Sequence, residues 1–281
     1  MLRRSLRALV VGAALLASAC SGTANDEDAA DVGATDEGAL RDGWSAIGNG
    51  VAYKATGAGD GVFIGYAGYS VPLDRSAAWV DALSDARLGA LGVGHLYAVR
   101  GPTDAGYANK DIGNTKLAAH LVGGAARAAR FVLVAAHSSG SYVAHELFGQ
   151  VFDGSGDPER LLEGKVVYAN LDGGQSGLDA SIIAALRRVA FVWAEDTTLS
   201  QGRSANASGM EALGQAHRGA GVRLVVDRSG CRSGAKWCLH DLLITTKPHD
   251  PSTFDLVRDY TDFADRRVQD GWVRALETSL R

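Results

Sequence analysis

Residues 130–148 read RFVLVAAHSSGSYVAHELF, and this stretch decides the fold. Its first part, 130–136, is a run of aromatic, β-branched and small residues that predicts a buried strand. From Gly140 to about residue 152, apolar residues recur at helical spacing. The residues between, 137–139, must then form a tight turn that joins a strand directly to a helix.

The rest of the chain repeats this alternation of short apolar runs and longer helical patterns. The further predicted strands are 62–66, 94–99, 165–171, 189–194 and 222–227, and the predicted helices are 75–91, 114–129, 140–152, 178–188 and 208–221, with C-terminal helices near 254–263 and 271–280. This order predicts an α/β fold, a doubly wound and mostly parallel sheet with helices on both faces. Functional sites in such sheets gather at the carboxyl ends of the strands.

One serine of the turn fits the requirements of a nucleophile. A serine on a strand-to-helix turn needs small residues two positions before and two positions after it, because the strand and the helix otherwise collide. Ser138 has Ala136 before it and Gly140 after it. The next serine has a histidine two positions before it, and the third lies within the helix. We therefore predict Ser138 as a nucleophile; the alternative interpretation is a serine that only caps the helix.

These features resemble the α/β-hydrolase superfamily. The resemblance covers roughly residues 60–281 and rests on A-H-S-S-G after a central strand, on YAGY at 66–69 after an early strand, and on a late histidine after the last strand. The alanine in place of the first glycine departs from the commonest motif and is shared with some small bacterial lipases. The resemblance implies a Ser–acid–His triad without a metal or another cofactor. Little more than one helix separates strands 165–171 and 189–194, so no large cap domain is expected.

The resemblance also implies the order of the triad, which is nucleophile, acid and then histidine. His240 follows the last predicted strand and is the expected base, with His249 as the alternative. Asp196 follows the next-to-last predicted strand and is the expected acid. Asp172, one strand earlier, is the alternative acid.

Two backbone N–H groups are expected to form an oxyanion hole, aimed at the negative charge that develops during acyl transfer. Ser139, directly after the nucleophile, is expected to supply one, and Gly68 or Tyr69 in YAGY the other. His137 and His145 lie close to Ser138 in the sequence but are not expected to act as the base.

The N-terminal residues predict export. Residues 1–20, MLRRSLRALVVGAALLASAC, combine a basic start, a short apolar run and small residues, as in a secretory signal peptide. The residues before Cys20 resemble a bacterial lipobox, which implies a lipid anchor at Cys20 in the cell envelope; the alternative is a periplasmic or secreted protein. Residues 21–42 are acidic and rich in alanine and glycine, as in a flexible tether, and 43–281 form the predicted hydrolase domain.

The remaining cysteines and the charge narrow the function further. Cys231 and Cys238 form an even pair in an exported chain, which predicts a disulfide beside His240 worth about 2.5 kcal/mol by chain entropy. Two cysteines alone do not supply the ligands of a zinc site. A formal net charge of -4 at pH 7 indicates no nucleic-acid partner.

The function implied by the resemblance is that of an esterase-like or lipase-like serine hydrolase. It would cleave an ester in a small or polymeric acyl substrate through an acyl-enzyme. Two alternatives stay open at this point: a binding lipoprotein that uses the scaffold without catalysis, and a serine peptidase with the same triad.

Overall fold

The apolar runs of the sequence form the strands of one sheet in the computed structural model of the protein. The structure describes residues 40–104, 112–196, 198, 202–219, 221–227, 238–241, 243, 244, 273, 274, 277, 278 and 280. The strands are β1 Ser45–Gly48, β2 Val51–Ala55, β3 Gly61–Tyr66, β4 Val93–Val99, β5 Val132–His137, β6 Val166–Leu171, β7 Arg188–Ala194 and β8 Val222–Asp227. All the predicted strands are confirmed, and β1 and β2 are additional.

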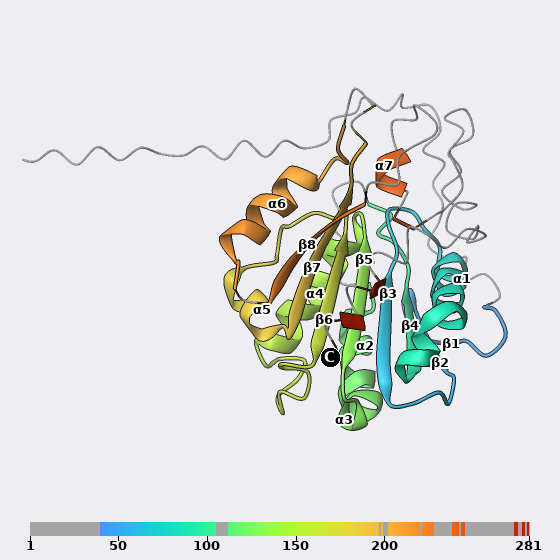
Figure 1. The fold of residues 1–281 in the computed structure, drawn as a ribbon. Helices are drawn as coiled ribbons and strands as arrows, with labels where there is room; N and C mark the ends of the chain where they lie inside the picture. Colours follow the sequence, from blue (N-terminus) through green and yellow to red (C-terminus); the bar gives the residue numbers. More distant parts are fainter. Residues whose placement is uncertain are drawn as a thin grey trace, which may run out of the picture. The chain divides into compact units, whose positions relative to one another are not determined.

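The sheet is mostly parallel. Its eight strands lie in the order β1-β2-β4-β3-β5-β6-β7-β8 (Figure 1). β1 pairs antiparallel with β2, and β2 pairs antiparallel with β4, whereas the other neighbouring pairs are parallel. The predicted α/β class with a mostly parallel sheet is therefore confirmed.

The helices follow the strands in the predicted alternation. They are α1 Leu73–Leu83, α2 Asn114–His120, α3 Ala126–Ala128, α4 Gly140–Phe152, α5 Ala180–Ala185, α6 Ala207–Ala216 and α7 Cys238–Asp241. The predicted helix 75–91 continues from α1 through a π-helical turn and a short 3-10 turn, and the predicted helix 114–129 is interrupted between α2 and α3 by a π-helical turn at Leu121–Ala125. That turn contains the glycine pair, which favours a local departure from the α-helix.

The helices pack on both faces of the sheet, and each face has its own apolar core. Side chains of α1 join one cluster, and so does Leu239 of α7. Side chains of α2, α4, α5 and α6 join the other cluster. Residues that alternate along β5 divide between the two clusters, with Ala135 on the α1 and α7 face and Ala136 on the α4 face. This alternation is the two-residue period of a strand covered on both sides.

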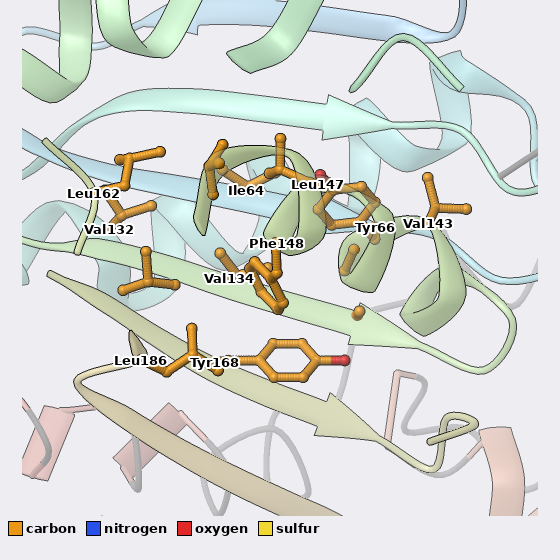
Figure 2. Packing of buried hydrophobic residues seen from close by; sticks show 14 of the residues in the cluster. Ile64, Tyr66, Val132, Val134, Val143, Leu147, Phe148, Leu162, Tyr168 and Leu186 are labelled. Atoms are coloured by element: carbon orange, nitrogen blue, oxygen red, sulfur yellow. The ribbon is translucent and has the colours of Figure 1, made fainter. Parts of the chain in front are cut away.

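The core beneath α4 fixes the helix that follows the nucleophile candidate. Figure 2 shows strand residues from β3, β5 and β6 packed against α4. Phe148 of α4 contacts Tyr168 of β6 edge to face, with ring centroids 5.0 Å apart. Because both rings are buried, the contact anchors α4 to the centre of the sheet and sets where its N-terminus lies.

The described residues belong to a unit that runs Glu37–Arg281, and Leu40 already packs against its core. The predicted signal peptide and the tether up to residue 39 lie outside the described residues. Within the part that is described, we find no helix of the length and apolarity that a membrane crossing needs.

Candidate active site

Ser138 lies in a strained turn between β5 and α4. The strand ends at His137 and the helix begins at Gly140, so that two serines form the whole connection. Ser138 has a φ of 55°, a left-handed conformation that costs a residue other than glycine about 1–2 kcal/mol. Its N–H donates to the carbonyl oxygen of Leu171 at 3.1 Å, and its carbonyl oxygen accepts from the hydroxyl of Ser141 at 2.8 Å. These bonds hold Ser138 in the geometry that nucleophile elbows use.

The two small residues around Ser138 lie in closely packed surroundings. A Cβ atom on Gly140 would lie 2.4 Å from the carbonyl oxygen of Ala67, directly after β3, and 2.8 Å from that of Tyr66, the last residue of β3. Ala136, two residues before Ser138, is fully buried. The turn therefore brings the start of α4 directly against the segment after β3.

His240 and Asp172 form a hydrogen-bonded pair at the end of β6. The Nδ1 of His240, on α7, lies 2.5 Å from Oδ2 of Asp172. A carboxylate accepts only, so we assign Nδ1 as the protonated nitrogen, which leaves Nε2 as the basic nitrogen of the neutral ring. Asp172 is completely buried and directly follows Leu171, which pairs with His137 in the β5–β6 register. The pair and Ser138 thus lie at the ends of adjacent strands.

Asn206 completes the surroundings of the Asp172 carboxylate. The backbone N–H of Asn206 donates to Oδ1 of Asp172 at 3.1 Å, and its side-chain amide donates to the Asp172 carbonyl oxygen at 2.7 Å. Each carboxylate oxygen therefore accepts a bond from a different segment. Asn206 precedes α6 and lies 34 residues from Asp172 in the chain, so no local pattern could have indicated this contact.

A second asparagine, Asn170, which was not predicted from the sequence, shapes the loop after β6. Asn170 accepts at its Oδ1 from the N–H of Gly173 at 2.7 Å and donates from its Nδ2 to the carbonyl oxygen of Gly174 at 3.0 Å. Asp172, between these contacts, has a φ of 45°. A Cβ atom on Gly173 would lie 2.5 Å from Cβ of Ser141, so the loop packs tightly against the first turn of α4.

The expected acid, Asp196, has a different local role, and the carboxylate that meets His240 is the alternative, Asp172. The Asp196 carboxylate accepts from the backbone N–H of Thr198 at 2.9 Å and from the Thr198 hydroxyl at 2.6 Å. The chain then reverses, with the backbone N–H of Asp196 donating to Gly202 and Glu195 bridging to Arg203. Asp196 therefore organises a turn beyond β7, which is one strand farther from β5 than β6 is.

The expected oxyanion-hole residues come from adjacent strands. Gly68 and Tyr69 follow β3, and Ser139 follows β5, its neighbour in the sheet. The contact of Gly140 with the segment after β3 brings these two stretches together. A Cβ atom on Gly101 would lie only 1.6 Å from the carbonyl oxygen of Gly68, so this segment is also packed from the other side. Tyr69 is 38% exposed, the largest exposure of a bulky apolar side chain among the described residues.

The two histidines near Ser138 are both buried and have other partners. Nδ1 of His145 lies 2.8 Å from the carbonyl oxygen of Ser176, to which it donates, and its Nε2 accepts from the Tyr168 hydroxyl at 3.0 Å. His145 thus links α4 to the loop after β6. His137 donates from Nε2 to the carbonyl oxygen of His240 at 3.1 Å, a contact with the expected base that sequence reasoning missed.

Several predicted residues lie outside the described part of the chain. These are Cys20, Cys231 and His249, while Cys238 begins α7 without a described side chain. The predicted disulfide and lipidation site therefore stay predictions. Among the described residues, no group of three or more His, Cys, Asp or Glu side chains is arranged to hold a metal ion.

The chain matches no protein-family model, and a comparison with curated proteins finds no match. What the site can do chemically is therefore inferred from the geometry of its residues.

Proposed function

We propose that the chain is a serine hydrolase of the α/β-hydrolase kind that cleaves ester bonds. Ser138 is the nucleophile, His240 the general base and Asp172 the acid that orients His240. The observation that carries this proposal is the strained Ser138 at the end of β5, next to the strand end where Asp172 and His240 pair. Strain in a serine at a strand-to-helix turn is favoured where the hydroxyl must reach a substrate.

The proposed reaction has two steps, acylation of Ser138 and deacylation by water. Nε2 of neutral His240 takes the Ser138 proton while Oγ bonds to the substrate carbonyl carbon, and Asp172 stabilises the imidazolium through Nδ1. The N–H groups of Ser139 and of Gly68 or Tyr69 stabilise the oxyanion. The C–O bond to the alcohol breaks as His240 returns the proton to it, leaving an acyl-enzyme. Water then repeats the sequence, with His240 as base, and releases the acid and free Ser138.

An apolar or acyl substrate is favoured by the rim of the site. Tyr69 is 38% exposed and directly follows Gly68, so its side chain can contact a substrate chain beside the expected oxyanion hole. A peptidase would use the same triad, and a binding protein would use the same surface without turnover. The experiment must therefore distinguish ester hydrolysis from both of these functions.

The experiment combines a serine-directed fluorophosphonate probe with hydrolysis of short p-nitrophenyl esters. We expect labelling of the native protein at Ser138, located by mass spectrometry, together with ester turnover, and we expect Ser138→Ala to lose both. Ser155→Ala is the matched control, because Ser155 is exposed and its hydroxyl bonds to nearby residues, to the carbonyl oxygen of Gln150 and to the Asp153 carboxylate. Turnover by Ser138→Ala at the wild-type rate would reject the triad, and absence of labelling in the native protein would favour the binding protein.

We also propose that the protein is exported and anchored to the bacterial cell envelope through Cys20. The support is the basic and apolar start of the chain and the small residues that precede this cysteine. Labelled palmitate fed to expressing bacteria should enter the wild-type protein and not Cys20→Ser. Equal labelling of both would remove the anchor from the proposal.

A further inference from the structure

His137 contacts the expected catalytic base in two ways. Its Nε2–H donates to the carbonyl oxygen of His240 at 3.1 Å, and the two imidazole rings lie 4.6 Å apart with an interplanar angle of 41°. His137 itself is 2% exposed and ends β5, so it belongs to the rigid centre of the sheet. These contacts join residues 103 positions apart in the chain.

The alternation of side chains along β5 explains why this histidine can reach His240. Ala135 and Ala136 point to opposite faces of the sheet. The period of two therefore directs His137 to the face of Ala135, which is also covered by Leu239 of α7. Ser138 leaves this alternation through its left-handed conformation.

We propose that His137 is a positioning residue that holds His240 in its working orientation. This inference rests on the proposed roles of Ser138 and His240. Helix α7 is only Cys238–Asp241, and a single turn has little stability of its own. His240 is therefore fixed from outside the helix, with Asp172 bound to Nδ1, and with His137 bound to its carbonyl oxygen and packed against its ring.

The neutral state of His137 suits this role. His240 gains a positive charge when it takes the serine proton, and a second charged ring 4.6 Å away would oppose that step. Burial lowers the pKa of His137 well below its ordinary value, and the charge of His240 lowers it further. A carbonyl oxygen only accepts, so the neutral ring carries its proton on Nε2 and keeps the bond to His240.

The test compares two substitutions of the same kind at equally buried histidines. His137→Leu removes the donor to His240, whereas His145→Leu removes the bonds to Ser176 and Tyr168 and none of the contacts described for His240. We expect His137→Leu to lower kcat for a p-nitrophenyl ester by about 10- to 100-fold with KM little changed, since small displacements of reacting groups have effects of this size. We expect His145→Leu to lower the melting temperature without this loss of kcat.

Two further readouts distinguish positioning from general destabilisation. The proton between His240 Nδ1 and Asp172 should give a proton NMR resonance far downfield of the amides, broadened or lost in His137→Leu and retained in His145→Leu. His137→Gln places an amide donor near the original Nε2 and should recover most of kcat, whereas the shorter His137→Asn should not. If His137→Leu does not fold, the test is the kcat of His137→Gln against that of His137→Asn. Equal kcat in these two variants overturns the proposal.

Failure of this inference and failure of the proposed function give different results. Wild-type kcat and an unchanged resonance in His137→Leu, with Ser138→Ala inactive, would overturn the positioning role and leave the hydrolase intact. Full activity of Ser138→Ala would overturn the hydrolase. The resonance can still be followed in Ser138→Ala, because it reports on His240 and Asp172 and needs no turnover.

Discussion

Replacing Gly140 by alanine should lower turnover by up to about a hundredfold while leaving the protein folded. The added Cβ atom would lie 2.4 Å from the carbonyl oxygen of Ala67, and ordinary contact begins at 3.4 Å, so the start of α4 must move about 1 Å away from the segment after β3. That movement separates Ser139 from Gly68 and Tyr69, the expected oxyanion donors. A misplacement of this size can reduce a rate by about a hundredfold, or about 2.7 kcal/mol.

Stability should also fall, because forced overpacking typically costs about 1–3 kcal/mol. Gly149→Ala is the matched control in the same helix, since a Cβ atom there meets no atom within 4 Å. It should raise the free energy of unfolding by about 0.5–1 kcal/mol, as alanine does in helix interiors. The two variants should therefore change stability in opposite directions.

The assay measures kcat on a p-nitrophenyl ester, corrected for the fraction of protein that a fluorophosphonate labels, and urea unfolding followed by circular dichroism. Wild-type kcat together with an unchanged unfolding midpoint in Gly140→Ala would refute the packing argument. A loss of stability with full kcat would refute only the link between this contact and the oxyanion hole.

Further predictions concern the acid, the oxyanion donor and the pH dependence of stability. Asp172→Asn should lower kcat by about four orders of magnitude, as loss of the orienting acid does in serine proteases. Asp196→Asn should have a kcat near that of the wild type. If ester assays give the reverse ranking, Asp196 is the acid. Ser139→Ala should keep its activity, because only the backbone N–H of this residue is used. Its free energy of unfolding in urea should rise by about 1 kcal/mol, since the Ser139 hydroxyl is buried without a hydrogen-bond partner among the described residues. Loss of activity would show that the hydroxyl has a role in turnover. Burial holds the pKa of His137 well below 6.5, so below pH 6.5 the unfolded chain binds more protons than the folded chain. The free energy of unfolding should therefore fall by up to about 1.4 kcal/mol per pH unit as the pH drops below 6.5. Equal pH dependence of the urea midpoints of wild type and His137→Leu would contradict this prediction.

The strands that could be predicted are those whose own residues favour burial on both faces. β5 to β8 are rich in β-branched and aromatic side chains, and each was found within about two residues of its predicted bounds. β1 and β2 were missed because SAIG and VAYKA are short and partly polar. Their strand conformation depends on pairing at the sheet edge, where Ala52 lies opposite Ala98 of β4.

Long-range pairing also explains why the sequence could not show which of the two candidate acids contacts His240. Asp172 and Asp196 both follow predicted strands, and nothing local separates them. What separates them is that β6 is the direct neighbour of β5 and that Asn206 reaches back to Asp172. The position of Ser138 on the turn, in contrast, could be predicted from its immediate neighbours, because the steric requirement on a strand-to-helix turn spans only five residues.

The triad candidates differ in how firmly the fold holds them. Ser138 and Asp172 follow adjacent strands of the sheet, whereas His240 lies on the one-turn helix α7. Opening of α7 alone would separate the base from the other two groups while the sheet stays folded. The free energy that protects activity is then that of a local opening rather than of global unfolding. On warming or in mild denaturant, the protein should therefore become inactive before it loses its secondary structure, and it should regain activity quickly when α7 docks again.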